Sequence, residues 1–175
     1  MNIDQLNDGF RLLVRELLGL PANSVRLADQ NAPIGNDPFV TVKFTTLAET
    51  GQDSHSYSAI GVTNNVLETG IGQRKLAISI QFFKGNATYQ ASRLKTLLTM
   101  ETGSTKLRAI GLGYIKTSSV RDLSVSVGTY FEPRSQIDLH VHVIAKETAV
   151  TPTILRAPIS MKTENILTNS EVFKP

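Results

Sequence analysis

Residues 74–83 have the sequence RKLAISIQFF, in which apolar residues alternate with small or polar ones. Every second position carries a large apolar side chain: Leu76, Ile78, Ile80 and Phe82. Successive side chains of a β-strand point to opposite faces of the sheet, so this pattern predicts a strand with one buried face. We expect Ala77, Ser79 and Gln81 on the opposite face of the same strand.

Two other segments alternate in the same way. In residues 38–46, PFVTVKFTT, one side carries Val40, Val42 and Phe44. In residues 136–143, QIDLHVHV, the apolar side consists of Ile137, Leu139, Val141 and Val143. The polar side of this last segment consists of Gln136, Asp138, His140 and His142. Three strands of this kind predict a mainly antiparallel sheet with one apolar face.

Two amphipathic helices are expected to cover that face. Residues 3–18 place apolar residues at helical spacing, and Gly19 ends this helix. The second helix begins after Asn86, the expected N-cap, and stops at Gly103. Its apolar stripe consists of Ala87, Ala91, Leu94 and Leu98. Helices and antiparallel strands in this order predict an α+β fold.

The segments between these elements are less regular. Residues 47–58, LAETGQDSHSYS, are polar and contain a glycine, so we expect a long mobile loop that contacts partners. Residues 59–70 are expected to form an irregular strand. Residues 105–128 predict a short strand near Lys106 to Ile115 and then a helical turn. We expect one domain over residues 1–151 and an extended C-terminal arm over residues 152–175, because prolines interrupt the arm.

The composition excludes several classes of protein. The chain of 175 residues contains no cysteine, which excludes disulfides, thiolate metal sites and cysteine nucleophiles. It has no apolar run of transmembrane length and no secretory signal at its start, so we expect no membrane partner. The net charge of +3 and the absence of tryptophan argue against a dedicated nucleic-acid-binding surface.

His140 and His142 raise the question of a metal site. They lie on one side of a predicted strand, and Glu147 follows at the spacing of the first metal motif of cupins. The flanking glycines of that motif are absent, and the third histidine, His55, is far away in the sequence. A catalytic metal needs about three protein ligands. We therefore expect no cofactor. A small metal-dependent enzyme or ligand binder that uses Asp138, His140 and His142 is the alternative hypothesis.

A charged cluster precedes the final strand. Glu132, Arg134 and Asp138 could form an ion pair that fixes the strand register or joins two subunits, and an ordinary solvated turn explains them equally well. The chain contains no phosphate-binding loop, dinucleotide fingerprint or nucleophile elbow. Nothing else in the sequence therefore indicates catalysis.

Three blocks of sequence resemble one known family. They are QNAPIGNDPFVTVKF (residues 30–44), QRKLAISIQFFKGNATYQASRLKTLL (residues 73–98) and YFEPRSQIDLHVHV (residues 130–143). Together with the first helix, they resemble the neck or tail terminator proteins of long-tailed bacteriophages over roughly residues 3–145. The order and spacing of the blocks carry this resemblance, and residues 105–128 lie outside the blocks.

The resemblance implies a structural role in the virion after assembly in the host cytoplasm. Terminators of this kind form a ring, usually a homohexamer, that caps the tail tube and presents a surface to head-completion proteins. In contractile tails they also contact the sheath protein, and DNA only passes through the lumen. The residues expected at partner or subunit contacts are Glu132, Arg134, Asp138, His140, His142, Ile154, Leu155 and Ile159.

Overall fold

The computed structural model describes residues 3–29, 35–60 and 65–152. These residues form three helices, α1 (Ile3–Leu18), α2 (Ala87–Thr99) and α3 (Glu101–Ala109). The main sheet consists of β1 (Val25–Leu27), β2 (Phe39–Glu49), β3 (Ser54–Ala59), β4 (Asn65–Phe83), β5 (Leu112–Thr117), β6 (Arg121–Asp122) and β9 (Arg134–Pro152). A separate two-stranded ribbon consists of β7 (Val125–Val127) and β8 (Tyr130–Glu132).

The sheet has the order β1-β2-β4-β9-β5, with β3 added to β4 and β6 added to β9. The predicted antiparallel arrangement is confirmed for the three alternating strands, since β4 runs antiparallel to both β2 and β9. Val42 faces Ile80, and Ile80 faces Ile137 in the next strand. β1 was not predicted and runs parallel to β2. The α+β fold is therefore confirmed.

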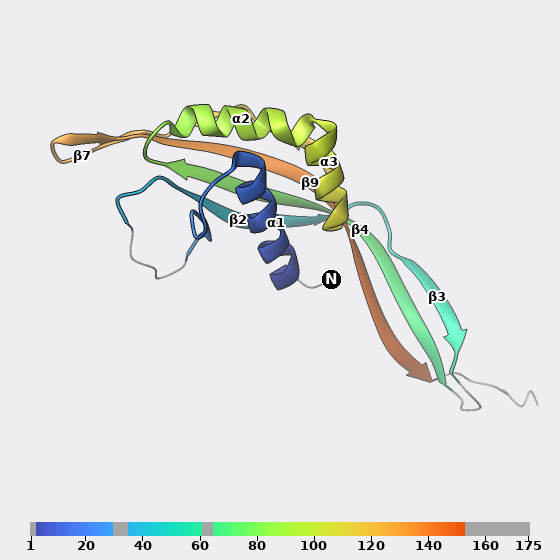
Figure 1. The fold of residues 1–175 in the computed structure, drawn as a ribbon. Coiled ribbons are helices and arrows are strands. Elements are labelled where there is room, and N and C mark those ends of the chain that lie inside the picture. Colours follow the sequence, from blue (N-terminus) through green and yellow to red (C-terminus); the bar gives the residue numbers. More distant parts are fainter. Residues whose placement is uncertain (1–2, 30–34, 61–64, 153–175) are drawn as a thin grey trace, which may run out of the picture.

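The helices lie on one side of the sheet, and the core is between them and the sheet (Figure 1). The predicted strand faces are confirmed, because the following residues are at most 5% exposed: Leu76, Ile78, Ile80, Ile137, Leu139 and Val141. The predicted stripe of α2 is also fully buried. Phe10 of α1 packs edge-on against Phe44, with ring centroids 6.3 Å apart. Burial of these side chains stabilises the fold by roughly 1.5–3 kcal/mol for each large one.

The prediction for residues 105–128 was wrong in two places. Glu101–Ala109 is a third helix, and the strand that follows begins only at Leu112. Gly103 does not stop α2; it lies buried in α3 and faces the last turns of α2. The expected helical turn is replaced by the short strands β6 and β7. Asn86 stands at the N-cap of α2 as expected, but its side chain makes no capping hydrogen bond.

Residues 47–58 are not a long loop. β2 continues to Glu49, and β3 begins at Ser54, so only residues 50–53 connect two strands. Of the irregular strand expected at residues 59–70, Ala59 is the end of β3 and residues 65–70 are the first part of β4, which runs without a break from Asn65 to Phe83. Residues 61–64 lie outside the described residues. Pairing between neighbouring strands, which single-strand periodicity does not reveal, explains the difference.

Part of the sheet extends beyond the helices. β3, residues 65–71 of β4 and residues 144–152 of β9 form a three-stranded projection, which we call the blade (Figure 1). Every residue of β3 is exposed. In β9, burial alternates as far as Val143 and is lost beyond it. The blade therefore consists of strands without a covering layer.

Candidate assembly surfaces

The face of the sheet opposite the helices is polar. It carries Gln136, Asp138 and His140, which are half-buried, and His142, which is exposed. In the register of β4 and β9, Ala77 faces His140 and Lys75 faces His142. Ser79 lies on this face but is only 7% exposed, because Gln136 Nε2 donates a hydrogen bond to its hydroxyl at 2.9 Å. We call this surface the open face.

Asp138 is held by several partners on the open face. Its carboxylate forms an ion pair with Arg121 of β6 and accepts a hydrogen bond from Gln136 Nε2 at 2.9 Å. Its backbone N–H donates to the Ser118 hydroxyl at 2.9 Å. The ion pair expected within the cluster of Glu132, Arg134 and Asp138 is therefore replaced by one with Arg121. This pair fastens β6 to β9, and only the register of β6 could have revealed it.

Arg134 has a different role from the expected one. Its side chain donates a hydrogen bond to Gln81 and lies over the ring of Phe83, with Cζ 4.6 Å from the ring centroid. Phe83 stacks on Phe39 with centroids 4.6 Å apart, and Arg26 lies over Phe39 at 5.5 Å. Two arginines thus enclose two stacked rings, an arrangement in which each cation is attracted to a ring face. Sequence spacing gave no signal for this stack, because its members come from four strands, β1, β2, β4 and β9.

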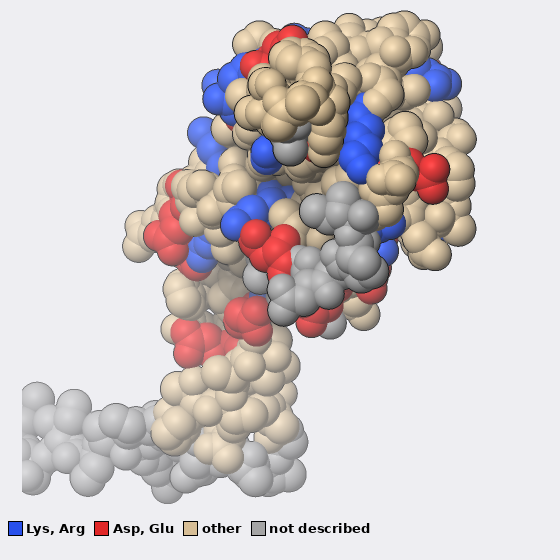
Figure 2. Space-filling view, turned by 90° about the vertical axis from the view of Figure 1, so that its left-hand side faces the viewer, with Lys and Arg blue, Asp and Glu red and all other residues tan. Residues whose placement is uncertain are grey.

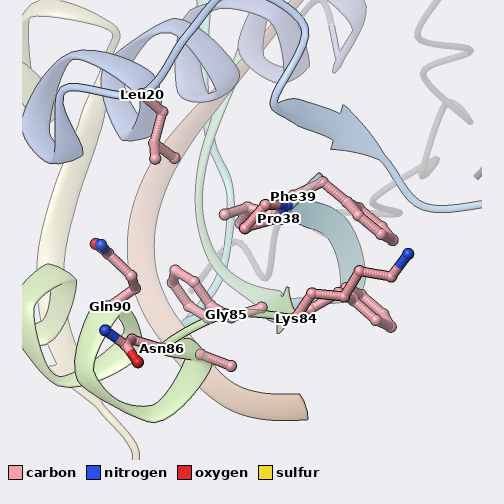
Figure 3. Close-up of a pocket in the computed structure, with 11 residues that line it drawn as sticks. Leu20, Pro38, Phe39, Lys84, Gly85, Asn86 and Gln90 are labelled. Carbon is pink, nitrogen blue, oxygen red and sulfur yellow. The ribbon is translucent and has the colours of Figure 1, made fainter. Parts of the chain in front are cut away.

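A cavity of about 310 Å³ adjoins the stack, between the start of β2 and the first turn of α2 (Figure 3). Its labelled lining residues include Leu20, Pro38, Phe39, Asn86 and Gln90. Most of the lining is apolar, and it includes no carboxylate or histidine. The cavity therefore suits an apolar side chain better than it suits catalysis.

An ion pair locks the base of the blade. Arg74 donates to both carboxylate oxygens of Asp53 at 2.6 Å, and the Arg74 side chain is only 13% exposed. This hydrogen bonding holds the pKa of Asp53 below its usual value and raises the pKa of Arg74. A Cβ at Gly72 would lie 2.1 Å from Asp53 Oδ1, so only glycine leaves room for the pair.

A second polar cluster crosses all three strands of the blade. The Glu68 carboxylate accepts hydrogen bonds from Tyr57 at 3.2 Å and from Thr151 at 3.0 Å, and it lies 3.0 Å from His55 Nδ1. Hydrogen bonds from Thr151 and His55 lower the pKa of Glu68, and the Glu68 charge raises the pKa of Tyr57. The cluster joins β3, β4 and β9 by side chains where no helix covers them.

The charges of the molecule are dispersed. In the space-filling view, lysine and arginine are scattered over the body, and acidic groups lie near its junction with the blade (Figure 2). Among residues 3–29, 35–60 and 65–152, no group of three metal-ligating side chains comes together. His140 and His142 thus gain no third ligand from the described residues. In the same part of the chain, no helix has the length and hydropathy needed to cross a membrane.

Comparison with known families identifies the chain. The profile of the phage neck terminator protein family matches residues 4–166, which include every element of the fold except the first residue of α1. The chain belongs to this family. The resemblance noted from three blocks of sequence is thereby confirmed, and the match also includes residues 105–128, which those blocks left out.

One similar structure is a sheath/tube terminator of an extracellular contractile injection system in the extended state. The two share 12% sequence identity with a TM-score of 0.49, over 97% of this chain and 66% of the other. The neck terminator thus spans slightly less than two thirds of that chain. No curated protein matches the sequence.

Three expected contact residues of the neck terminator, Ile154, Leu155 and Ile159, lie outside the described residues. Of the others, Glu132 is at the end of β8, on the ribbon, and is half-buried. Arg134, Asp138, His140 and His142 share the open face, although Arg134 and Asp138 are occupied by contacts within the chain. The structure therefore brings His140 and His142 together as accessible groups on one surface.

Proposed function

We propose that this chain is a structural virion protein that forms a ring, a homohexamer, at the head-proximal end of the phage tail tube. The ring ends tube polymerisation and joins the tail to head-completion proteins. In a contractile tail it also contacts the last ring of the sheath protein, and DNA passes through its lumen. It acts in the virion after assembly in the host cytoplasm.

The family match over residues 4–166 carries this proposal. The geometry supports it, because there are two kinds of surface that the described residues leave uncovered. The open face is a polar sheet surface suited to a hydrated lumen or to a neighbouring subunit. The blade extends away from the body and suits contacts above or below the ring (Figure 1).

The proposed role involves no catalysis and no cofactor. Asp138, which the alternative hypothesis makes a metal ligand, is committed to Arg121 and Gln136. The described residues that line the cavity next to α2 include no carboxylate and no histidine. Elemental analysis of protein purified without chelator should find no stoichiometric metal. One equivalent of metal per chain that disappears in the variant with both His140→Ala and His142→Ala would favour the enzyme or ligand binder instead.

The proposal also assigns different roles to the two parts of the chain. Residues 1–151 form the ring-building domain, and residues 152–175 form an arm that binds a neighbouring subunit or a tail protein. Ile154, Leu155 and Ile159 supply the apolar groups of that arm, and His140 and His142 lie at a partner surface. Segments with apolar groups and prolines order well by binding along another surface.

A mass measurement tests the ring directly. Light scattering on the purified chain, together with native mass spectrometry, should give six times the 19.1 kDa protomer. Negative-stain electron microscopy should show rings with a central opening. A phage that lacks the protein should accumulate tails of abnormal length or tails without heads. A monomer at all concentrations, combined with normal tails in the mutant phage, would contradict the proposal.

A further inference from the structure

The two outer strands of the blade have open edges. Among the residues that the structure describes, β3 pairs only with β4. The part of β9 beyond Val143 likewise pairs there only with β4, because the pairing of β5 with β9 stops at Val143. The backbone groups that face outward on these two edges can be assigned from printed hydrogen bonds. They form a surface that neither the open face nor the helices include.

On β3, the outward groups belong to the odd-numbered residues. Ile60 N donates to the carbonyl of Asn65, and the Ser54 hydroxyl donates to the carbonyl of Ile71. Even positions of β3 therefore direct their backbone toward β4, since hydrogen-bonded pairs alternate along an antiparallel ladder. The N–H and C=O groups of His55, Tyr57 and Ala59 point away from the sheet.

On β9, the outward groups belong to the even-numbered residues. Ser118 N donates to the carbonyl of Asp138 on the β5 side, whereas Lys84 N donates to the carbonyl of Pro133 on the β4 side. The β4–β9 ladder contains no bulge from Asn65–Pro152 to Phe83–Arg134, so this parity continues into the blade. The outward groups are those of Ile144, Lys146, Thr148 and Val150.

The edge of β3 lacks the usual protection against pairing, and the edge of β9 has it at few positions. Proteins protect edge strands with charged residues, prolines, bulges or covering elements. β3, with the sequence SHSYSA, has no lysine, acid or proline, and its pairing with β4 is regular. The edge of β9 has two charged residues of opposite sign, Lys146 and Glu147, and its one proline, Pro152, is at the end of the strand. Three strands without a packed layer are marginal on their own, which favours an added strand.

The directions of the two edges identify the partner. β3 and β9 both run antiparallel to β4, so they run parallel to each other. In a ring, copies are related by rotation and keep one orientation relative to the axis, so the β9 edge of one copy can meet the β3 edge of the next. Repetition of this contact closes the blade strands into a barrel and removes the open edges of the blades.

We propose that the blades of neighbouring copies join edge to edge, with β9 of one copy paired in parallel to β3 of the next. This inference rests on the proposed ring. It specifies which strands meet where two copies join, a contact that we call the seam. The partner is a second copy of this chain.

The side chains at such a seam are compatible. Ser54, Ser56 and Ser58 of β3 lie on the same face as Lys146 and Thr148 of β9, and none of the serines is charged. On the other face, β3 presents His55 and Tyr57, and β9 presents Glu147 and Ala149. The fixed charges of the two strands all belong to β9, so no like charges meet across the seam.

Cysteine cross-linking tests the seam, because the chain has no cysteine of its own. The variant with Ser56→Cys and Thr148→Cys places thiols on one face of the two edges. Within a copy, β4 separates these positions by roughly 9.5 Å, which is too far for a disulfide. Oxidation should therefore yield a ladder of covalent multimers on a non-reducing denaturing gel. Lys146→Cys and Val150→Cys, each combined with Ser56→Cys, cover a shift of register.

Three controls complete the experiment. Each single-cysteine variant should remain a monomer on the gel, and a dimer from Ser56→Cys alone would indicate that two β3 edges meet instead. Ser56→Cys combined with Tyr89→Cys, which is on an exposed position of α2, should give no ladder. Thiol titration in denaturant verifies that the thiols of each variant have been oxidised.

The outcomes separate the two proposals. A ladder whose longest member matches the native mass supports the seam. A ring by native mass with no ladder from any of the three double variants overturns the seam and leaves the ring intact. A monomeric chain with no ladder overturns both.

Discussion

Gly103 stands where a methyl group would collide with the preceding helix. A Cβ there would lie 2.1 Å from the backbone oxygen of Leu97, and backbone cannot move aside as a side chain can. We therefore expect Gly103→Ala to destabilise the fold by about 1–3 kcal/mol through overpacking. Urea unfolding measures this difference. Thr105→Ala, on an exposed position of the same helix, should change stability little, and equal effects would show that α3 does not pack on α2 as described.

The faces of the sheet make a second residue-scale prediction. Ile78 and Leu139 are fully buried, whereas His140 lies on the open face. Ile78→Ala and Leu139→Ala should each cost about 2–5 kcal/mol, because truncation loses buried area and leaves a cavity. His140→Ala should change the melting temperature of the isolated chain little. Similar losses from all three variants would mean that the faces are assigned wrongly.

Individual burial was predictable for apolar residues and less so for polar ones. Alternation placed Leu139 and Ile80 correctly, because burial of a large apolar side chain decides which way a strand faces. Ser79 was assigned to the solvated side and is buried there by Gln136. Arg134 was expected in an ion pair and stacks on Phe83 instead. Such contacts depend on which strands are neighbours, and local spacing does not contain that information.

At the scale of elements, the lock at the base of the blade depends on pH. Arg74 lowers the pKa of Asp53 below 3.8, so the pair contributes stability above that value and loses it as the pH falls through the folded-state pKa. Asp53→Asn should therefore lower the urea midpoint at neutral pH. The difference from the wild type should shrink well below pH 3.8. A difference that stays constant into the acid range would show that the Asp53 charge is not what stabilises the blade.

The open edge of β9 predicts the effect of one proline. Thr148 directs its N–H outward, so Thr148→Pro removes a donor from the edge without removing a bond to β4. We expect the circular dichroism of this variant to stay near native while its native mass falls to that of smaller species. Thr148→Ala keeps the N–H and should assemble normally. Loss of assembly in both variants would point to the side chain rather than the backbone.

Element prediction succeeded where one face is buried and failed where neither face is. The central strands and α2 have clear periodicity, because a helix layer and a sheet layer share one core. The sequence of β3 has no alternation of apolar and polar residues, so it resembled a polar loop. β6 and α3 were missed because a two-residue strand has no period and glycine inside a helix imitates a stop.

At the scale of the whole molecule, the C-terminal arm should be separable from the fold. The core cluster lies within the described residues before it, so deletion of residues 153–175 should leave the circular dichroism and cooperative unfolding nearly unchanged. Under the proposed function, the truncated chain should bind tails more weakly, and phages that carry it should accumulate tails without heads. Co-sedimentation with purified tails measures the binding. Normal attachment by the truncated chain would remove the arm from the set of partner contacts.

β4 and β9 also determine how force passes through the molecule. Each contains 19 residues, and they are paired along their whole length, so together they form a beam roughly 60 Å long. A pull along the strands at the blade tip loads the hydrogen bonds of this ladder in shear, and many bonds share the load at once. Both strands turn between body and blade, but no bulge interrupts the ladder there (Figure 1). We therefore expect a displacement of the tip to turn the helix-covered body with it, so that mechanical work done on one end of the molecule is delivered at the other.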